Sequence, residues 1–219
     1  MPSIRSFYAV NRGGGLFSEG VSQWIGAVIA STAARLRLKP THLTLINLVI
    51  GIGLSTAVVL QADSLPRWLG ALALVGWQAA YAFDCADGQL ARVTGQGSIA
   101  GARIDIICDV ATQIALVTAL AAVAEAPVWL AAAFAGTWMV NLVTSVLATS
   151  DKAASMVTST SLPVRLVKLI RDYGALILVA GLVLTFAPQW MIWVVGAFTV
   201  INGVFLIASI AFTARAALR

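Results

Sequence analysis

Residues 66–109 read PRWLGALALVGWQAAYAFDCADGQLARVTGQGSIAGARIDIICD, in which an apolar run ends in two carboxylates and a second run begins with two more. Asp84 and Asp87 are three residues apart and Asp105 and Asp109 are four apart, so each pair shares one face of a helix. The polar linker between the pairs is short. The stretch therefore predicts two antiparallel helices that bring four carboxylates together at one end.

The rest of the chain is equally apolar. Of its 219 residues, 60% are hydrophobic and only 11% are charged, against about 25% charged residues in ordinary soluble domains. This composition excludes a disordered chain, a fibrous repeat and a typical soluble domain. We predict an all-α integral membrane protein with six transmembrane helices, which cover about 42–62, 66–92, 102–125, 127–149, 163–187 and 189–213.

Loop charges predict the orientation of these spans. All of the 14 Lys and Arg residues except Arg67 fall on one side of the predicted membrane. The positive-inside rule places that side, both termini and the carboxylates in the cytoplasm. A net charge of +5 could also indicate nucleic acid, but the basic residues are scattered and form no dense patch, so we exclude that partner.

Residues 1–40 are predicted to form a cytoplasmic arm, and residues 41–219 the transmembrane catalytic domain. Within the arm, residues 18–38 alternate apolar and polar positions at helical spacing, with Val21, Trp24, Ile25 and Val28 on one face. This pattern is typical of an amphipathic helix that lies in the membrane interface. A seventh span is the alternative for the same segment.

The four carboxylates indicate a metal site. At a few ångströms from one another they cannot all stay ionised unless cations lie between them. A ligand set made only of oxygen suits Mg²⁺ or Mn²⁺. The small side chains of Gly88 and Ala91, with Arg92 nearby, leave room for a diphosphate. Two alternatives remain: buried carboxylates paired with Arg92 and Arg103, and a proton or cation relay.

The motif D-x-x-D-G-x-x-A-R, eight residues, then G-x-x-x-D-x-x-x-D resembles the signature of the CDP-alcohol phosphatidyltransferases. The fixed positions of that signature are matched here by Asp84, Asp87, Gly88, Ala91, Arg92, Gly101, Asp105 and Asp109. In addition, Pro40-Thr41-His42-Leu43-Thr44 resembles the P-x-x-L-T segment of the family. Eight fixed residues at fixed spacing are far more specific than a single glycine motif.

The resemblance implies an enzyme that transfers a substituted phosphate from a CDP-linked donor, such as CDP-diacylglycerol, to an alcohol and releases CMP. It implies two divalent cations, Mg²⁺ or Mn²⁺, held by the four aspartates, with Asp109 also as the general base. The positions that it places at the CDP group are Pro40, Thr41, His42, Leu43, Thr44, Gly88, Ala91, Arg92, Ser98 and Gly101. We further expect a homodimer in a bacterial plasma membrane.

The acceptor is less well specified. The basic residues that surround the start of the predicted fifth span are Lys152, Arg165, Lys168 and Arg171. They predict a pocket for an anionic acceptor, for example a polyol phosphate such as inositol phosphate. The alternative is ordinary positive-inside charge. By spacing, Asp172 can share a helix face with Arg165, Lys168 and Arg171.

Two rival functions predict different features. An intramembrane prenyltransferase would carry its aspartate motifs on well-separated spans, and a transporter with an acidic relay would act without releasing CMP. Of the remaining polar residues, Tyr81 and Tyr173 are predicted to be interfacial anchors. Gln78 and Gln113 are predicted to form hydrogen bonds between helices.

Overall fold

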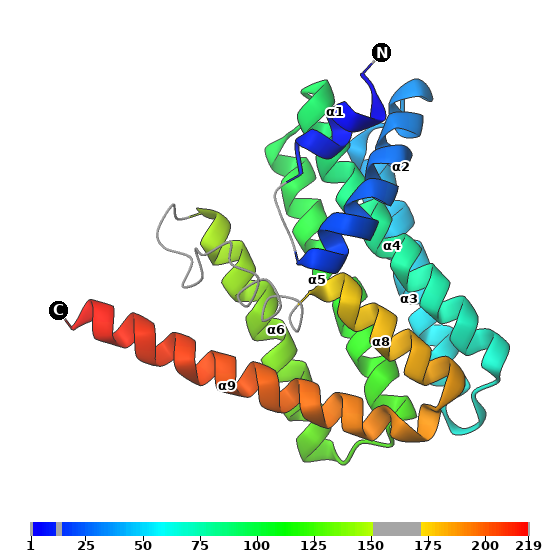
Figure 1. Cartoon of the computed structure of the whole chain (residues 1–219), viewed down its shortest axis with the longest axis vertical. Coiled ribbons are helices and arrows are strands. Elements are labelled where there is room, and N and C mark those ends of the chain that lie inside the picture. The colour runs from blue at the N-terminus through cyan, green and yellow to red at the C-terminus, as the bar shows by residue number, and fades with distance from the viewer. Residues whose placement is uncertain (1, 12–14, 151–171, 219) are drawn as a thin grey trace.

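A computed structural model describes residues 2–11, 15–150 and 172–218, and these residues form helices and no strands (Figure 1). The helices are α1 (Ile4–Ala9), a π-helical turn (Ser18–Ser22), α2 (Gln23–Arg35), α3 (Pro40–Leu60), a 3₁₀ turn (Ala62–Ser64), α4 (Arg67–Thr94), α5 (Ile99–Val123), α6 (Val128–Ser150), α8 (Tyr173–Phe186), a 3₁₀ turn (Pro188–Trp190) and α9 (Met191–Ala217). The predicted all-α class is confirmed for this part of the chain.

The α4–α5 hairpin carries the four aspartates, and its turn is fixed by local chemistry. Gly95 ends α4 in the left-handed conformation, with φ at +68°, which glycine adopts without strain. Ser98 then begins α5, because its hydroxyl accepts a hydrogen bond from the backbone N–H of Gly101. The two helices therefore run antiparallel and bring the carboxylate pairs to the same end, as predicted.

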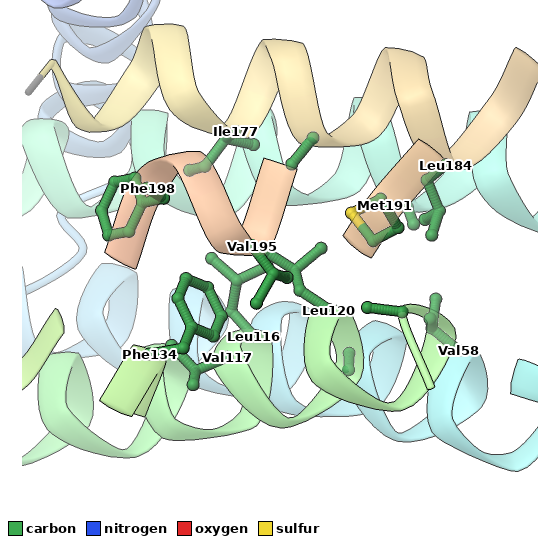
Figure 2. Close-up of a cluster of buried hydrophobic side chains, with 14 of the residues drawn as sticks. Val58, Leu116, Val117, Leu120, Phe134, Ile177, Leu184, Met191, Val195 and Phe198 are labelled. Atoms are coloured by element: carbon green, nitrogen blue, oxygen red, sulfur yellow. The ribbon is translucent and has the colours of Figure 1, made fainter. Parts of the chain in front are cut away.

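The other helices pack around this hairpin. Helix α3 contacts both α4 and α5, α8 lies along α4, and α9 packs mainly against α6. The main core is formed by apolar side chains that include Leu120, Phe134, Ile177 and Val195, which come from α5, α6, α8 and α9 (Figure 2). The C-terminal half of α9 extends away from the bundle (Figure 1).

Four helical segments of the described chain are long and apolar enough to cross a membrane: Pro40–Leu60, Arg67–Thr94, Ile99–Val123 and Pro188–Ala211. Two shorter apolar helices, Val128–Val140 and Tyr173–Phe186, lie at the fourth and fifth predicted spans. Large apolar side chains on the outside, such as Val49 and Ile107, are about two-thirds exposed or more, as expected in contact with lipid. The chain is therefore an integral membrane protein, while the count of six spans stays a prediction.

Polar residues also join the helices. As predicted, Gln78 of α4 donates a hydrogen bond to the carbonyl of Gly174 in α8. Gln113 of α5 accepts one from the indole N–H of Trp138 in α6. These two hydrogen bonds link the hairpin to the helices that follow it.

The N-terminal arm lies against the end of α4 that carries the aspartates. The face of α2 that packs on α4 consists mainly of small residues, and a Cβ atom at Gly26 would meet the Ala82 carbonyl at 3.2 Å. The predicted apolar face, which includes Val21, Ile25 and Val28, points away from the protein. A helical segment at 18–35 is therefore present, and its position in the membrane interface stays a prediction.

Candidate metal and substrate site

The four aspartates meet between α4 and α5. One carboxylate oxygen from each of Asp84, Asp105 and Asp109 lies within 4.8 Å of the other two. The carboxyl group of Asp84 contacts that of Asp109, and the carboxyl group of Asp87 contacts that of Asp105. Asp87 itself is 4% exposed. The hairpin thus brings together all four residues that the sequence selected.

This arrangement fits a divalent cation. Its donor set is made of carboxylate oxygens, which are the ligands that Mg²⁺ and Mn²⁺ prefer. Oδ1 of Asp105 is buried and has no hydrogen-bond partner among the described residues, and buried polar atoms normally have one. A cation held by Asp84, Asp105 and Asp109 would satisfy that oxygen. The cluster can therefore bind a divalent metal.

The segment Pro40–Thr44 reaches the cluster through its last residue. The hydroxyl of Thr44, on the first turns of α3, donates a 2.5 Å hydrogen bond to Oδ2 of Asp87. His42 is exposed, and its Nδ1 accepts a hydrogen bond from the backbone N–H of Lys39 at the start of α3. Leu43 is buried against the arm. The structure thus gives Thr44 a contact within the site and His42 a capping contact.

Arg92 lies at the exposed end of α4, beside Gly88. A Cβ atom at position 88 would meet Nη1 of Arg92 at 2.9 Å, so a larger residue there would displace the guanidinium from its present position. Nε of Arg92 donates a 2.9 Å hydrogen bond to the carbonyl of Val10, which follows α1. The arm therefore holds Arg92 in place. The contact joins residues 82 positions apart, and local sequence patterns contain no sign of it.

Ser98 and Gly101 form the N-terminal cap of α5. Because the hydroxyl of Ser98 accepts from the N–H of Gly101 at 2.9 Å, both residues have a structural role at this end of the helix. Ala91 lies one residue before Arg92 and is half-buried. A Cβ atom at position 101 would meet the Ser98 hydroxyl at 3.0 Å, which is a tight contact.

A cavity of about 200 Å³ adjoins the carboxylates, between α3, α4, α5 and α8. Asp84 and Asp109 form one part of its wall, and Asn47, Tyr81 and Tyr173 contribute polar groups. The two tyrosine rings meet edge to face with centroids 4.9 Å apart. The sequence pattern indicated interfacial anchors at both tyrosines, whereas the structure places them in the cavity wall. Tyr81 lies three residues before Asp84 and therefore on the same helix face, and this spacing could have indicated a position beside the carboxylates.

Asp172 lies at the start of α8. Its backbone is extended, with ψ at 114°, and its carboxylate caps the N-terminus of α8 by accepting from the N–H of Gly174. Whether Asp172 shares a helix face with Arg165, Lys168 and Arg171 stays a prediction, because those three residues lie outside the described residues. The predicted acceptor residues Lys152, Arg165, Lys168 and Arg171 lie outside the described residues.

The fold and the cluster define a class of protein: a helical membrane protein with a metal-compatible carboxylate site at one end of its bundle. Residues 37–213 match the CDP-alcohol phosphatidyltransferase family. The chain belongs to that family, and the resemblance read from the aspartate signature is confirmed. The match begins just before α3 and covers most of the chain.

A curated protein from Corynebacterium glutamicum, named phosphatidylinositol phosphate synthase, is 34% identical to this chain over 106 residues. The alignment covers 48% of this chain and 46% of that protein. The similarity thus extends over about half the length of each protein.

Proposed function

We propose that this protein transfers a phosphatidyl or similar substituted phosphate group from a CDP-alcohol, CDP-diacylglycerol being the first candidate, to an alcohol acceptor. CMP is the second product. The observation that carries the proposal is the meeting of Asp84, Asp105 and Asp109 within 4.8 Å, in a chain of this family. A helical bundle of this kind offers the lipid chains of the donor a route from the bilayer to the site.

Asp84, Asp87, Asp105 and Asp109 would hold two divalent cations, Mg²⁺ or Mn²⁺. Such cations supply charge neutralisation on the diphosphate and lower the pKa of the attacking hydroxyl. The alcohol oxygen forms a bond to the lipid-bearing phosphorus, the phosphoanhydride bond breaks, and CMP leaves with the electron pair. Asp109 faces both the other carboxylates and the cavity, and this position supports our assignment of Asp109 as the general base that takes the proton of the alcohol.

Other residues would bind and orient the donor. Thr44 holds Asp87 through its 2.5 Å hydrogen bond, which fixes the orientation of that ligand. Arg92, beside Gly88, offers a positive charge for a phosphate or for the cytidine group. We assign the remaining residues of the Pro40–Thr44 segment, together with Ala91, Ser98 and Gly101, to the surroundings of the CDP group.

For the acceptor, we propose a polyol phosphate such as inositol phosphate. The name of the relative from Corynebacterium glutamicum supports this choice. The basic residues Lys152, Arg165, Lys168 and Arg171 would bind its phosphate. A neutral alcohol would not need them, so the acceptor's charge is a direct test of their role.

The rival functions have less support. A prenyltransferase would divide its aspartates between distant helices, whereas these lie on the two arms of one hairpin. A relay would extend its carboxylates through the bundle, whereas all four gather at one end of α4 and α5. We also propose both termini in the cytoplasm, a catalytic domain over residues 41–219, a bacterial plasma-membrane location and a homodimer.

The proposal is tested by incubating purified protein with labelled CDP-diacylglycerol, Mg²⁺ or Mn²⁺, and inositol phosphate, inositol or glycerol phosphate in parallel. We expect CMP release that requires inositol phosphate and yields a labelled phospholipid of matching mass. CMP release with glycerol phosphate alone would overturn the acceptor and keep the reaction type. No release with any acceptor, in protein shown to be folded, would contradict the transferase function.

A further inference from the structure

Asp172 is a buried carboxylate outside the metal cluster, and four donors converge on it. It is 3% exposed. Its Oδ2 accepts from the backbone N–H of Ser18 at 2.9 Å. Its Oδ1 accepts from the N–H groups of Gly174 and Ala175 and from the hydroxyl of Ser18. The carboxylate thereby joins the arm to the first turn of α8 across 154 positions of the chain.

The contacts of Asp172 fix the direction of the hydrogen bond between the hydroxyl groups of Ser18 and Tyr81. Both oxygens of Asp172 accept backbone N–H groups, so the carboxylate acts as an acceptor and the single hydroxyl proton of Ser18 points to it. The Ser18 hydroxyl also lies 3.0 Å from the hydroxyl of Tyr81. Because Ser18 has no second proton to give, Tyr81 must donate in that contact. The proton of Tyr81 is therefore directed toward the arm.

The direction of the Tyr81 proton determines which hydrogen bonds Tyr81 can form with a ligand in the cavity. Tyr81 lines it together with Asp84 and Asp109, and a phenol whose proton is already used offers only lone pairs on its other side. The ring is held edge to face by Tyr173. The thiol of Cys85 also contacts Tyr81, but a thiol is a weak donor. A ligand hydroxyl at this wall would thus meet an oriented acceptor next to the carboxylates.

We propose that Asp172, acting through Ser18, fixes Tyr81 as a hydrogen-bond acceptor for a hydroxyl group of the alcohol substrate. This inference rests on the proposed function, because it assigns that substrate to the cavity. Asp172 and Ser18 are positioning residues, and Tyr81 is the residue that touches the ligand. The arrangement selects hydroxyl groups, which can donate, over ether or ester oxygens, which cannot.

The kinetic test uses Tyr81→Phe, Ser18→Ala and Asp172→Asn. Ser22→Ala is the matched control, because its hydroxyl lies in the same π-helical turn, is equally buried and has no hydrogen-bond partner among the described residues. We expect the three test variants to raise KM for inositol phosphate about 5- to 10-fold and to leave KM for CDP-diacylglycerol unchanged. The control should match the wild type.

A double variant separates positioning from a general loss of stability. Combining Asp172→Asn with Tyr81→Phe should raise the acceptor KM no further than Tyr81→Phe alone, because both changes remove the same contact. Effects that multiply, or a rise confined to the KM of the donor, would overturn the inference. Should Asp172→Asn not fold, Ser18→Ala combined with Tyr81→Phe gives the same comparison.

A spectroscopic test needs no turnover. The chain has three tyrosines, so 3-fluorotyrosine labelling gives three ¹⁹F resonances, and Tyr81→Phe identifies the one at position 81. That resonance should move in Ser18→Ala, stay in place in Ser22→Ala and shift when inositol phosphate is added to the wild type. If the enzyme is active but its Tyr81 resonance does not shift when inositol phosphate is added, the inference about Tyr81 is overturned and the proposed function stands. An inactive protein whose resonance shifts would overturn the proposed function and retain the site.

Discussion

At the scale of single residues, the site depends on carboxylates whose roles differ. Asp105 contributes a buried oxygen that has no hydrogen-bond partner among the described residues. Asp87 is held by Thr44, and Asp109 faces the cavity. Each role predicts a different consequence of substitution, so the residues can be tested one at a time.

Asp109→Asn removes the proposed base and one metal ligand while it preserves side-chain volume. We expect CMP release to fall by at least about 10²- to 10⁴-fold, the range that general base catalysis supplies. The thermal midpoint of the purified protein should stay near the wild-type value. Full activity in this variant would remove Asp109 from the mechanism.

Thr44→Ala removes the hydroxyl that holds Asp87. We expect the Mn²⁺ concentration for half-maximal activity to rise by about 10-fold, because groups that orient a metal ligand typically contribute that much to affinity. Thr44→Ser, which keeps the hydroxyl, is the control and should stay close to wild type. The hydrogen bond has no part in metal binding if both variants show the same Mn²⁺ dependence.

At the scale of elements, helix starts and close packing set the positions of these residues. The cap at Ser98 begins α5 seven residues before Asp105, and Gly26 lets α2 lie against α4. The sequence signature includes neither Ser98 nor Gly26. Their effect on the site is through helix placement.

Gly26→Val should detach the arm from α4, because its Cβ would meet Cys85, Ala82 and Ala86 at 3.0 to 3.3 Å. Overpacking of this kind costs about 1–3 kcal/mol. We expect a lower thermal midpoint together with a higher KM for the CDP donor, since the arm also holds Arg92. Gly20→Val is the control, because a Cβ atom at position 20 would have nothing within 4 Å. Equal midpoints in the two variants would contradict the packing role of Gly26.

Much of the arrangement of the helices along the chain was predictable from the sequence. The second predicted span, 66–92, corresponds to α4 at Arg67–Thr94, and the fourth, 127–149, to α6 at Val128–Ser150. Apolar runs bounded by proline and charge set helix limits locally. The carboxylate cluster followed from spacing within one hairpin, which is also local information.

The contacts that join distant parts of the chain were not predictable. Ser18 meets Asp172 across 154 positions and Val10 meets Arg92 across 82. Periodicity indicates which face of a helix is apolar, but it contains no information about which other helix a polar side chain will reach. Asp172 is an example: its partners are Ser18 of the arm and the first N–H groups of α8, and its position in the sequence indicated neither.

At the scale of the whole molecule, the prediction is a bundle with the aspartates, the arm and both termini on the cytoplasmic side. The two native cysteines are free and buried, so an introduced cysteine can report the topology. In intact cells, a membrane-impermeant maleimide should label Ser64→Cys, in the α3–α4 turn, and not Ser3→Cys. Inverted vesicles should give the opposite pattern. Labelling of both positions from one side would contradict an odd number of crossings between them.

The central claim is a metal-dependent transfer at the aspartate cluster, and one measurement tests it most directly. CMP released from CDP-diacylglycerol is followed with inositol phosphate and Mn²⁺, for the wild type and for Asp105→Asn, each with and without a chelator in excess. We predict CMP release only from the wild type with free Mn²⁺. Equal release from Asp105→Asn, or release that persists in the chelator, would contradict the assignment of this cluster as the metal site of the enzyme.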